Sequence, residues 1–268
     1  MKGSMLSLKS LRIDPIKVER KIVNFIDEEV EKAGLRGGVV AVSGGVDSST
    51  TLTLAVSALG PENVRAVTMP EKGVTSMRDV RDVMDLTERL GVTCDVVEIT
   101  PLVDVMRDIL PLYDPENLIP FGNVKARLRM AIVYHFANSL NMMVIGSTNK
   151  TEWLLGYFTK YGDGGVDLMP IADLYKTQVR QLARYLGLPE DIVMKTPTAG
   201  LWPGQTDEGE LGMSYETLDL ILYGWERGMK VEEIASDLSL SPSHVEGVLK
   251  RVERNEHKRR LPLILKLS

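Results

Sequence analysis

The 268-residue sequence predicts an α/β protein: a doubly wound, mostly parallel sheet flanked by helices, followed by a helical C-terminal part. The first observation behind this prediction is a series of short apolar runs, typical of buried strands. These runs are Val39–Val42, Val64–Met69, Val92–Ile99 and Met142–Gly146. The second observation is that stretches with helical periodicity separate the runs, as they do in parallel sheets with helical crossovers.

Helices are expected before and between these strands. A helix over Val18–Ala33 precedes the first strand and ends at Gly34. In Thr75–Leu90 one helix face is apolar, so we expect that face to be buried. It carries Met77, Val80, Val83, Met84 and Leu90. A third helix is expected over Asn123–Asn141, directly after Gly122.

The second half of the chain contains one segment without periodicity. Gly200–Gly209 has several helix breakers, and we expect a mobile loop of the kind that covers active sites. Helices are expected after this loop, and Val231–Glu246 resembles a helix-turn-helix. No repeat or low-complexity tract divides the sequence, and 268 residues could form one large domain or two small ones.

The composition is that of an ordinary globular protein, with 44 % apolar and 26 % charged residues. No apolar run approaches the ~20 residues that span a bilayer, and Met1–Ser10 lacks the apolar stretch of a signal peptide. A single cysteine, Cys94, excludes an internal disulfide and a cysteine-rich metal site. These features indicate a cytoplasmic protein. Because the net charge is −5, neither nucleic acid nor a membrane is expected as a partner.

The most informative segment is AVSGGVDSS, residues 41–49, at the predicted end of the first strand. A strand that turns through glycines into a helix N-terminus binds anions, because unpaired backbone N–H groups and the helix dipole point at the turn. Gly44 and Gly45 allow a phosphate to approach the backbone, and three serines add hydroxyl donors. The segment therefore predicts a phosphate site.

This loop carries an acid where a Walker-type loop would carry a lysine before the Ser/Thr. The acid is Asp47. A carboxylate and a phosphate can lie side by side only when a metal ion between them offsets their negative charges. The segment resembles the SGGxDS pyrophosphate loop of ATP pyrophosphatases, which cleave ATP between the α- and β-phosphates. Two further segments, Met69–Glu71 and Gly146–Asn149, also follow predicted strands, and ligands of such sheets bind beyond the carboxyl ends of the strands.

Five more segments extend the resemblance. They are Asn123–Met130 (NVKARLRM), Gly146–Glu152 (GSTNKTE), Phe158–Asp167 (FTKYGDGGVD), Lys195–Leu201 (KTPTAGL) and Glu256–Arg260 (EHKRR). Together with the loop, they make most of the chain similar to ammonia-dependent NAD synthetases. The resemblance implies that residues 1–268 form a single domain with a Rossmann-like ATP pyrophosphatase fold. It also implies a ligase that catalyses the last step of NAD biosynthesis.

In the reaction that this resemblance implies, ATP adenylates the nicotinate carboxylate of deamido-NAD and releases pyrophosphate. Ammonia then displaces AMP and leaves the amide of NAD. The resemblance also implies Mg²⁺ as the cofactor and ATP as a co-substrate. It further implies a homodimer with the helix Gly122–Leu140 at or near the interface.

The resemblance assigns the metal and ATP sites by position. Asp47 and Glu152 correspond to the Mg²⁺ ligands, and hard carboxylate oxygens suit this ion. Lys176 corresponds to a lysine that contacts the ATP phosphates, and with Asp47 it is an expected catalytic residue. The implied ATP contacts are Ala41, Val42, Ser43, Gly44, Gly45, Val46, Asp47, Ser48, Ser147, Lys176 and Thr198. Relatives often have Thr where Ser147 stands, which keeps the hydroxyl.

The deamido-NAD site implied by the resemblance consists of Arg127, Lys160, Asp167, His257 and Lys258. The dinucleotide is anionic, so the basic residues among them are suited to its phosphates, whereas Asp167 is better suited to a ribose hydroxyl or an amide. Asp167 is also the expected third catalytic residue, as a base for the amidation step, although the sequence does not identify that base.

The ammonia source follows from the position of the cysteine. Glutamine-using relatives have an extra amidase domain with a cysteine nucleophile, whereas here the first strand begins near Val39 and Cys94 lies in a predicted strand. We therefore expect free ammonia, or ammonia from a separate protein, as the nitrogen donor.

Two other functions share part of this sequence pattern. A different pyrophosphatase-loop enzyme, GMP-synthetase-like or tRNA-thiolating, shares the loop but not the FTKYGDGG or EHKRR segments. A nucleotide-sensing helix-turn-helix regulator is suggested by Val231–Glu246, but the chain is acidic and its second helix offers His244, Glu246 and Lys250 rather than an Arg/Asn-rich face.

Overall fold

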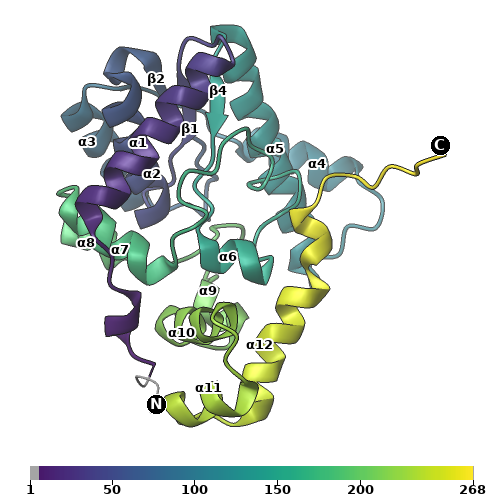
Figure 1. Ribbon diagram of the computed structural model, residues 1–268. Coiled ribbons are helices and arrows are strands. Elements are labelled where there is room, and N and C mark those ends of the chain that lie inside the picture. Colours follow the sequence, from purple (N-terminus) through teal and green to yellow (C-terminus); the bar gives the residue numbers. More distant parts are fainter. Residues whose placement is uncertain (1–5, 268) are drawn as a thin grey trace.

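The computed structural model describes residues 6–267 (Figure 1). Met1–Met5, half of the segment considered above for a signal peptide, lie outside the described residues. Within residues 6–267, no helix combines the length and apolar character needed to cross a membrane.

Four parallel strands form one sheet in the order β3-β2-β1-β4, which confirms the predicted fold class. They are β1 (Gly38–Ala41), β2 (Val64–Thr68), β3 (Thr93–Val96) and β4 (Met143–Ile145). From β1 the chain builds the sheet outward through β2 and β3, and it then returns to place β4 on the other side of β1. In doubly wound sheets such a reversal opens a crevice at the carboxyl ends of the strands, and ligands bind there.

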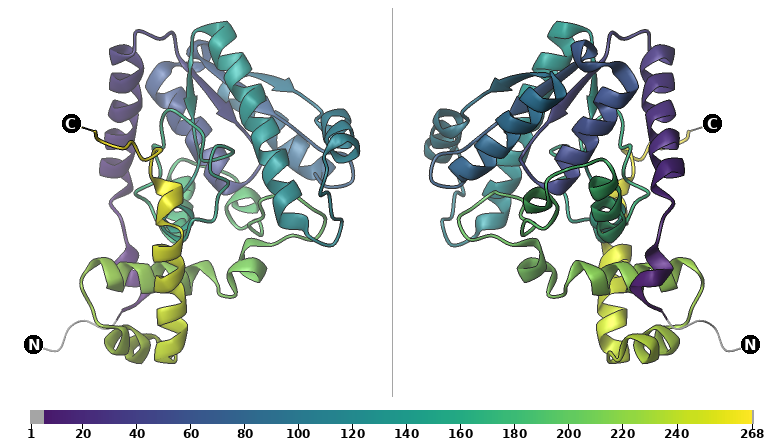
Figure 2. Two further views of the ribbon diagram at one scale, coloured as in Figure 1. Left: turned by 90° about the vertical axis from the view of Figure 1, so that its right-hand side faces the viewer. Right: turned by 90° about the vertical axis from the view of Figure 1, so that its left-hand side faces the viewer.

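Helices cover both faces of the sheet. The first face carries α1 (Pro15–Lys32), α2 (Val46–Leu59), α3 (Met77–Leu90) and α7 (Lys176–Tyr185), and the second carries α4 (Thr100–Ile109) and α5 (Leu118–Leu140). Strand β1 shows the alternation that this requires, since Val40 is buried in the core under the first face and Val39 in the core under the second. Figure 2 shows α1, in purple, and α5, in teal, on opposite sides of the sheet.

A separate helical layer follows the sheet in the chain and lies below it in Figure 1. Its core is built mainly by α6 (Lys150–Leu155), α10 (Tyr215–Glu226), α11 (Val231–Leu238) and α12 (Pro242–Arg254). The short helices α8 (Glu190–Val193) and α9 (Asp207–Leu211) lie in the connecting segments. The 3₁₀ helices are η1 (Leu8–Leu11), η2 (Pro61–Asn63) and η3 (Glu256–Arg259). Helices α11 and α12 pack on each other, as the helix-turn-helix pattern predicted.

Two predicted helices begin earlier than expected. Helix α1 begins at Pro15, because the Asp14 carboxylate caps it by accepting from the Lys17 backbone N–H at 3.2 Å. Helix α5 begins at Leu118, so that Gly122 lies inside the helix instead of before it. A Cβ at Gly122 would lie 3.1 Å from the Trp202 ring, so this glycine permits a close approach of the 201–203 segment.

Two expectations about side chains and loops were wrong. The predicted buried face of α3 is incorrect at Met77 and Met84, which are exposed, whereas Leu86 is buried. The helix lies over the edge of the sheet, so only part of its apolar face meets the core. The irregular segment predicted to extend to Gly209 ends at Thr206, because the Thr206 hydroxyl caps α9 and Asp207 begins that helix.

Candidate functional site

The phosphate loop joins β1 to α2. Gly44 has a φ of +79°, a conformation that glycine adopts without strain, and Gly45 caps α2 in an extended conformation. The Ser48 hydroxyl accepts from the Ser43 backbone N–H at 3.1 Å, and the two serine hydroxyls are also 3.1 Å apart. The loop is therefore folded by its own side chains around the N-terminus of a 14-residue helix, which is a site for an anion.

Lys195 fastens this loop to α3. Its Nζ donates to the Gly44 carbonyl oxygen at 2.7 Å, to Asp79 Oδ1 at 2.8 Å and to Asp82 Oδ2 at 2.5 Å. A Cβ at Gly44 would lie 2.8 Å from the Asp79 carbonyl oxygen, so loop and helix are in close contact there. In the sequence, Lys195 is recognisable only as part of a resembling segment, and nothing there predicted this role.

The two predicted metal ligands lie together at neighbouring strand ends. Asp47 is in the first turn of α2, after β1, and Glu152 is in the first turn of α6, after β4. The Asn149 amide donates to Asp47 Oδ1 at 3.0 Å, and its backbone N–H donates to Glu152 Oε2 at 3.2 Å. Asn149, which caps α6, therefore fixes both carboxylates.

Lys176 lies between these carboxylates. Its ammonium group forms ion pairs with Asp47 and, at 3.4 Å, with Glu152 Oε1. The first residue of α7 is thus buried, although most lysines at helix ends are exposed. The structure therefore brings Asp47 together with two residues that lie more than a hundred positions later in the sequence.

Tyr215 and Asp207 complete the cluster, and the sequence analysis missed both. The Tyr215 hydroxyl lies 3.2 Å from Glu152 Oε1 and 2.9 Å from Asp207 Oδ2, and it bridges the two carboxyl groups. The Tyr157 hydroxyl lies 3.2 Å from Asp207 Oδ1. Asp207 immediately follows the 196–206 segment, so these bonds attach the end of that segment to the acidic cluster.

The charges in the cluster do not balance. Burial raises the pKa of Glu152 to about 8; Lys176 opposes this rise, and Asp47 and Asp207 add to it. Burial also raises the pKa of Asp207. For Lys176, burial alone would lower the pKa, but Asp47 and Glu152 outweigh it and raise the pKa above the usual lysine value. Three carboxyl groups share one ammonium, and they leave a deficit of positive charge.

This donor set fits Mg²⁺. Within residues 6–267, no group of three or more histidine, cysteine, aspartate or glutamate side chains has the arrangement of a complete metal site. Two carboxylates next to a phosphate loop nevertheless suit Mg²⁺, which keeps several waters and is held by one or two carboxylates plus substrate phosphates. Asp47 and Glu152 are the residues that could hold it.

A buried aspartate sets the position of Lys176. Asp219 accepts from the Thr151 hydroxyl at 2.5 Å and from the Thr177 backbone N–H at 2.8 Å, and Thr151 in turn accepts from the Lys176 backbone N–H at 3.1 Å. Burial raises the pKa of Asp219 to about 6. This network links α6, α7 and α10 directly behind the ion pairs.

Four of the five predicted deamido-NAD residues lie together. Arg127 Nη2 donates to the Lys160 carbonyl oxygen at 3.1 Å, and Lys160 Nζ donates to the His257 carbonyl oxygen at 2.7 Å. Lys258 Nζ donates to the carbonyl oxygens of Gly156 and Phe158 at 2.7 and 2.9 Å. We call Arg127, Lys160, His257 and Lys258 the basic group; its cations are held by carbonyl dipoles instead of by carboxylates.

In the described part of the chain, Asp167, the fifth predicted deamido-NAD residue, forms no hydrogen bond with the basic group and is held by other residues. Its carboxylate accepts from the Tyr134 hydroxyl at 3.0 Å and from the Val144 backbone N–H at 2.8 Å, and these bonds hold it against α5 and the start of β4. The predicted ATP contacts Ser147 and Thr198 are also outside the acidic cluster. Ser147 follows β4, and the exposed Thr198 accepts from the Gly200 backbone N–H at 3.1 Å.

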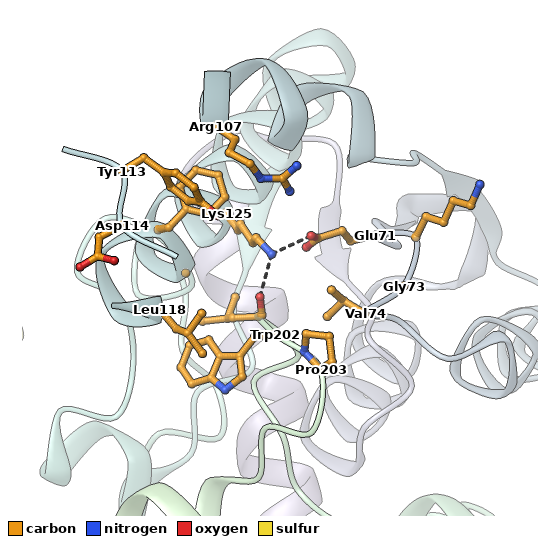
Figure 3. Close-up of a pocket in the computed structure, with 14 residues that line it drawn as sticks. Glu71, Gly73, Val74, Arg107, Tyr113, Asp114, Leu118, Lys125, Trp202 and Pro203 are labelled. Carbon is orange, nitrogen blue, oxygen red and sulfur yellow. Dashed lines mark hydrogen bonds and ion pairs between the residues drawn. The ribbon is translucent and has the colours of Figure 1, made fainter. Parts of the chain in front are cut away.

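A cavity of about 280 Å³ opens beside the Met69–Glu71 segment (Figure 3). The buried Lys125 donates to Glu71 Oε1 at 2.6 Å and to the Leu201 carbonyl oxygen at 2.8 Å. Trp202 and Pro203 line the opposite wall. Lys125 thus holds the 200–206 segment at the rim of the crevice, and the sequence analysis named this lysine only within a resembling segment.

Comparisons with known proteins agree with this geometry. A family model described as NAD synthase matches residues 18–262. The NH(3)-dependent NAD(+) synthetase of Methanosarcina acetivorans is 46 % identical over 94 % of this chain and 98 % of its own length. That of Pyrococcus furiosus is 43 % identical over 94 % of this chain and 95 % of its own length.

Solved structures share the fold. The NMN synthetase of Francisella tularensis has a TM-score of 0.83 and 32 % identity, covering 96 % of this chain and 100 % of that one. The NH3-dependent NAD synthetase of Campylobacter jejuni, solved with a nitrate ion, has a TM-score of 0.80 and 31 % identity, covering 95 % and 100 %.

Proposed function

Because the chain belongs to the NAD synthase family, we propose that the crevice described above uses ATP to join ammonia to the carboxyl group of deamido-NAD. The products are NAD, AMP and pyrophosphate. The protein is thus an ammonia-dependent ligase that forms a C–N bond in NAD biosynthesis. This family membership leaves the GMP-synthetase-like, tRNA-thiolating and helix-turn-helix regulator alternatives without support.

The observation that carries the proposal is the meeting of the phosphate loop with Asp47, Glu152 and Lys176 at the carboxyl ends of β1 and β4. The loop and α2 would bind the ATP phosphates. The proposed contacts are Ala41, Val42, Ser43, Gly44, Gly45, Val46, Asp47 and Ser48, with Ser147, Lys176 and Thr198. Mg²⁺ held by Asp47 and Glu152 would neutralise phosphate charge.

In the first step, a carboxylate oxygen of the nicotinate attacks the α-phosphorus of ATP, and the bond to the bridging oxygen of pyrophosphate breaks. Negative charge grows on the departing pyrophosphate, and Lys176 is placed to stabilise it as a mobile point charge. The Lys176 ammonium is already paired with Asp47 and Glu152. It moves to the phosphates when another cation takes its place at those two carboxylates.

In the second step, ammonia attacks the activated carbonyl carbon, and AMP leaves with the former carboxylate oxygen. One proton must leave the nitrogen, and Asp167 is our proposed acceptor. The basic group and Asp167 are proposed to bind deamido-NAD, and the exposed cations of that group are supported in this role by the charge of the dinucleotide. The 196–206 segment would keep water from the adenylate.

We further propose that the chain forms one domain, acts in the cytoplasm and works as a homodimer. The dimer is supported by the exposed face of α5 next to the basic group, where a second subunit could share the substrate.

The test is a product assay with deamido-NAD, Mg-ATP and ammonium that follows NAD, AMP and pyrophosphate together. We expect the three products in equal amounts, no support from glutamine, and loss of all three in Asp47→Ala. Asp173→Ala, which removes an exposed partner of Lys150, is the matched control. Because one related structure is named an NMN synthetase, nicotinate mononucleotide is tested as a competing acceptor. Absence of ATP cleavage would contradict the proposal.

A further inference from the structure

The C-terminal segment 261–267, LPLILKL, exposes five large apolar side chains. Leu261, Leu263, Ile264, Leu265 and Leu267 are each at least 80 % exposed. In an extended chain, alternate residues share a face, so four of the leucines form one apolar edge about 20 Å long. An uninterrupted apolar edge of this kind on a folded protein marks an interaction site.

The segment begins at a fixed point. Arg259 Nη1 donates to the Leu154 carbonyl oxygen at 2.6 Å and Nη2 to the Val252 carbonyl oxygen at 3.0 Å, which holds η3 against α6 and α12. From there the chain leaves the molecule on the side away from α4, as both views of Figure 2 show. The apolar side chains of the segment are therefore exposed to solvent on the side of the molecule opposite α4.

That opposite side carries a second exposed apolar surface. Leu102, Val105 and Ile109 follow one another at intervals of three and four residues along α4, and all three are exposed. Next to α4, a cavity of about 200 Å³ is lined by residues that include Leu112, Tyr113 and Phe121.

The two surfaces carry opposite charge. Residues 100–117 contain four acids, Asp104, Asp108, Asp114 and Glu116, and one arginine. Residues 261–267 contain Lys266 and no acid, whereas Arg260 is already paired with Glu256 and Arg259 with backbone carbonyls. Acidic side chains around an apolar surface disfavour an anionic membrane as its partner and favour a basic one.

We propose that segment 261–267 of one subunit docks on the α4 surface of a second copy of this chain. The leucine edge covers Leu102, Val105 and Ile109, and Lys266 meets the acids beside them. This docking rests on the homodimer proposed above, and it gives segment 261–267 the role of holding the two subunits together. The area per segment is small, and two equivalent contacts related by the dimer axis would double it.

Cysteine cross-linking tests this contact directly. In a Cys94→Ser background, a tagged Val105→Cys chain is mixed with an untagged Leu265→Cys chain and oxidised. We expect a disulfide-linked heterodimer at least ten times as abundant as with Glu232→Cys, an exposed position on α11, in place of Val105→Cys. A chain that ends at Arg260 should show a dimer dissociation constant raised at least about tenfold.

The other outcomes are informative. A dimer mass without the Val105–Leu265 cross-link overturns the docking and leaves the homodimer intact, whereas a monomer mass overturns both. In a single chain that carries both Val105→Cys and Leu265→Cys, a disulfide within that chain shows that the segment folds back, which also overturns the docking. Tail-dependent sedimentation with phosphatidylserine vesicles, in the absence of the cross-link, assigns the segment to membranes instead.

Discussion

The acidic cluster and the basic group lie in the same molecule but hold their charges in different ways. In the cluster, Lys176 is buried and paired with Asp47 and Glu152, so opposite charges face each other directly. In the basic group, Lys160 and Lys258 donate to backbone carbonyls. Carbonyl dipoles orient a cation without neutralising it, so the basic group keeps a field for an anionic ligand. The acidic cluster instead places its one ammonium between carboxylates and keeps a deficit of positive charge, which favours the entry of another cation.

The largest expected effect comes from breaking the cluster at Lys176. We expect Lys176→Met to lower kcat by about 10²–10³-fold, because the growing charge on pyrophosphate loses its cation. It should also lower the free energy of unfolding by about 3 kcal/mol or more, since two buried carboxylates lose their partner. Steady-state kinetics and urea unfolding measure the two effects.

Lys150→Met is the control for Lys176→Met. Lys150 also pairs with two acids, Asp173 and Glu226, each at 2.9 Å, but it lies at the start of α6 outside the cluster. We expect kcat within about threefold of the unchanged protein for this control. Equal kcat losses in both variants would show that the loss comes from destabilised helices and not from the missing phosphate contact.

The pH dependence of stability tests the buried Asp219, which positions Lys176 through its hydrogen bonds to Thr151 and Thr177. The Asp219 pKa rises from 3.8 to about 6 on folding because of burial, so the folded state favours the protonated form. Asp219 should therefore cost no stability below pH 4 and about 3 kcal/mol above pH 6. Urea unfolding across this range should show the unchanged protein losing that amount relative to Asp219→Asn as pH rises. Parallel curves for the two proteins would contradict the assigned shift.

A smaller effect is expected at Lys195, which joins the phosphate loop to α3. Lys195→Gln should raise KM for ATP about tenfold with a smaller change in kcat, because the Gly44 carbonyl loses the donor that orients the loop. Lys195→Arg should recover part of this loss. Lys32→Gln, which removes a surface lysine that pairs with Glu28 and Glu29, is the control and should leave KM unchanged. An unaltered KM in Lys195→Gln would show that the loop orients itself.

The smallest effect is expected in the basic group. Arg127→Gln should raise KM for deamido-NAD several-fold and leave KM for ATP unchanged, since an exposed cation contributes modestly to binding. Added salt should reduce the difference between the two proteins. Arg20→Gln, on the exposed side of α1, is the control. A kcat loss without a KM change would place Arg127 in the chemical step instead.

Much of the fold could be predicted because local patterns determine it. The four apolar runs became the four strands, and the glycine turn before Val46 became the start of α2. The predictions of helix ends and buried side chains were wrong where packing overrides local preference. Gly122 reads as a helix boundary, yet it lies within α5, where its missing side chain leaves room for the Trp202 ring. Met77 fits an apolar helix face yet lies in solvent at the edge of the sheet.

The sequence by itself determined the phosphate loop with Asp47 and the order of strands and helices, since each depends on residues within a few positions of one another. Glu152 was expected only from the resemblance. Only the tertiary structure decided that Lys176 lies between those carboxylates, that Tyr215 joins Glu152 to Asp207, and that Lys195 holds Gly44. These contacts join residues that are distant in the chain. Their energies depend on distance and burial, and the folded chain alone sets both.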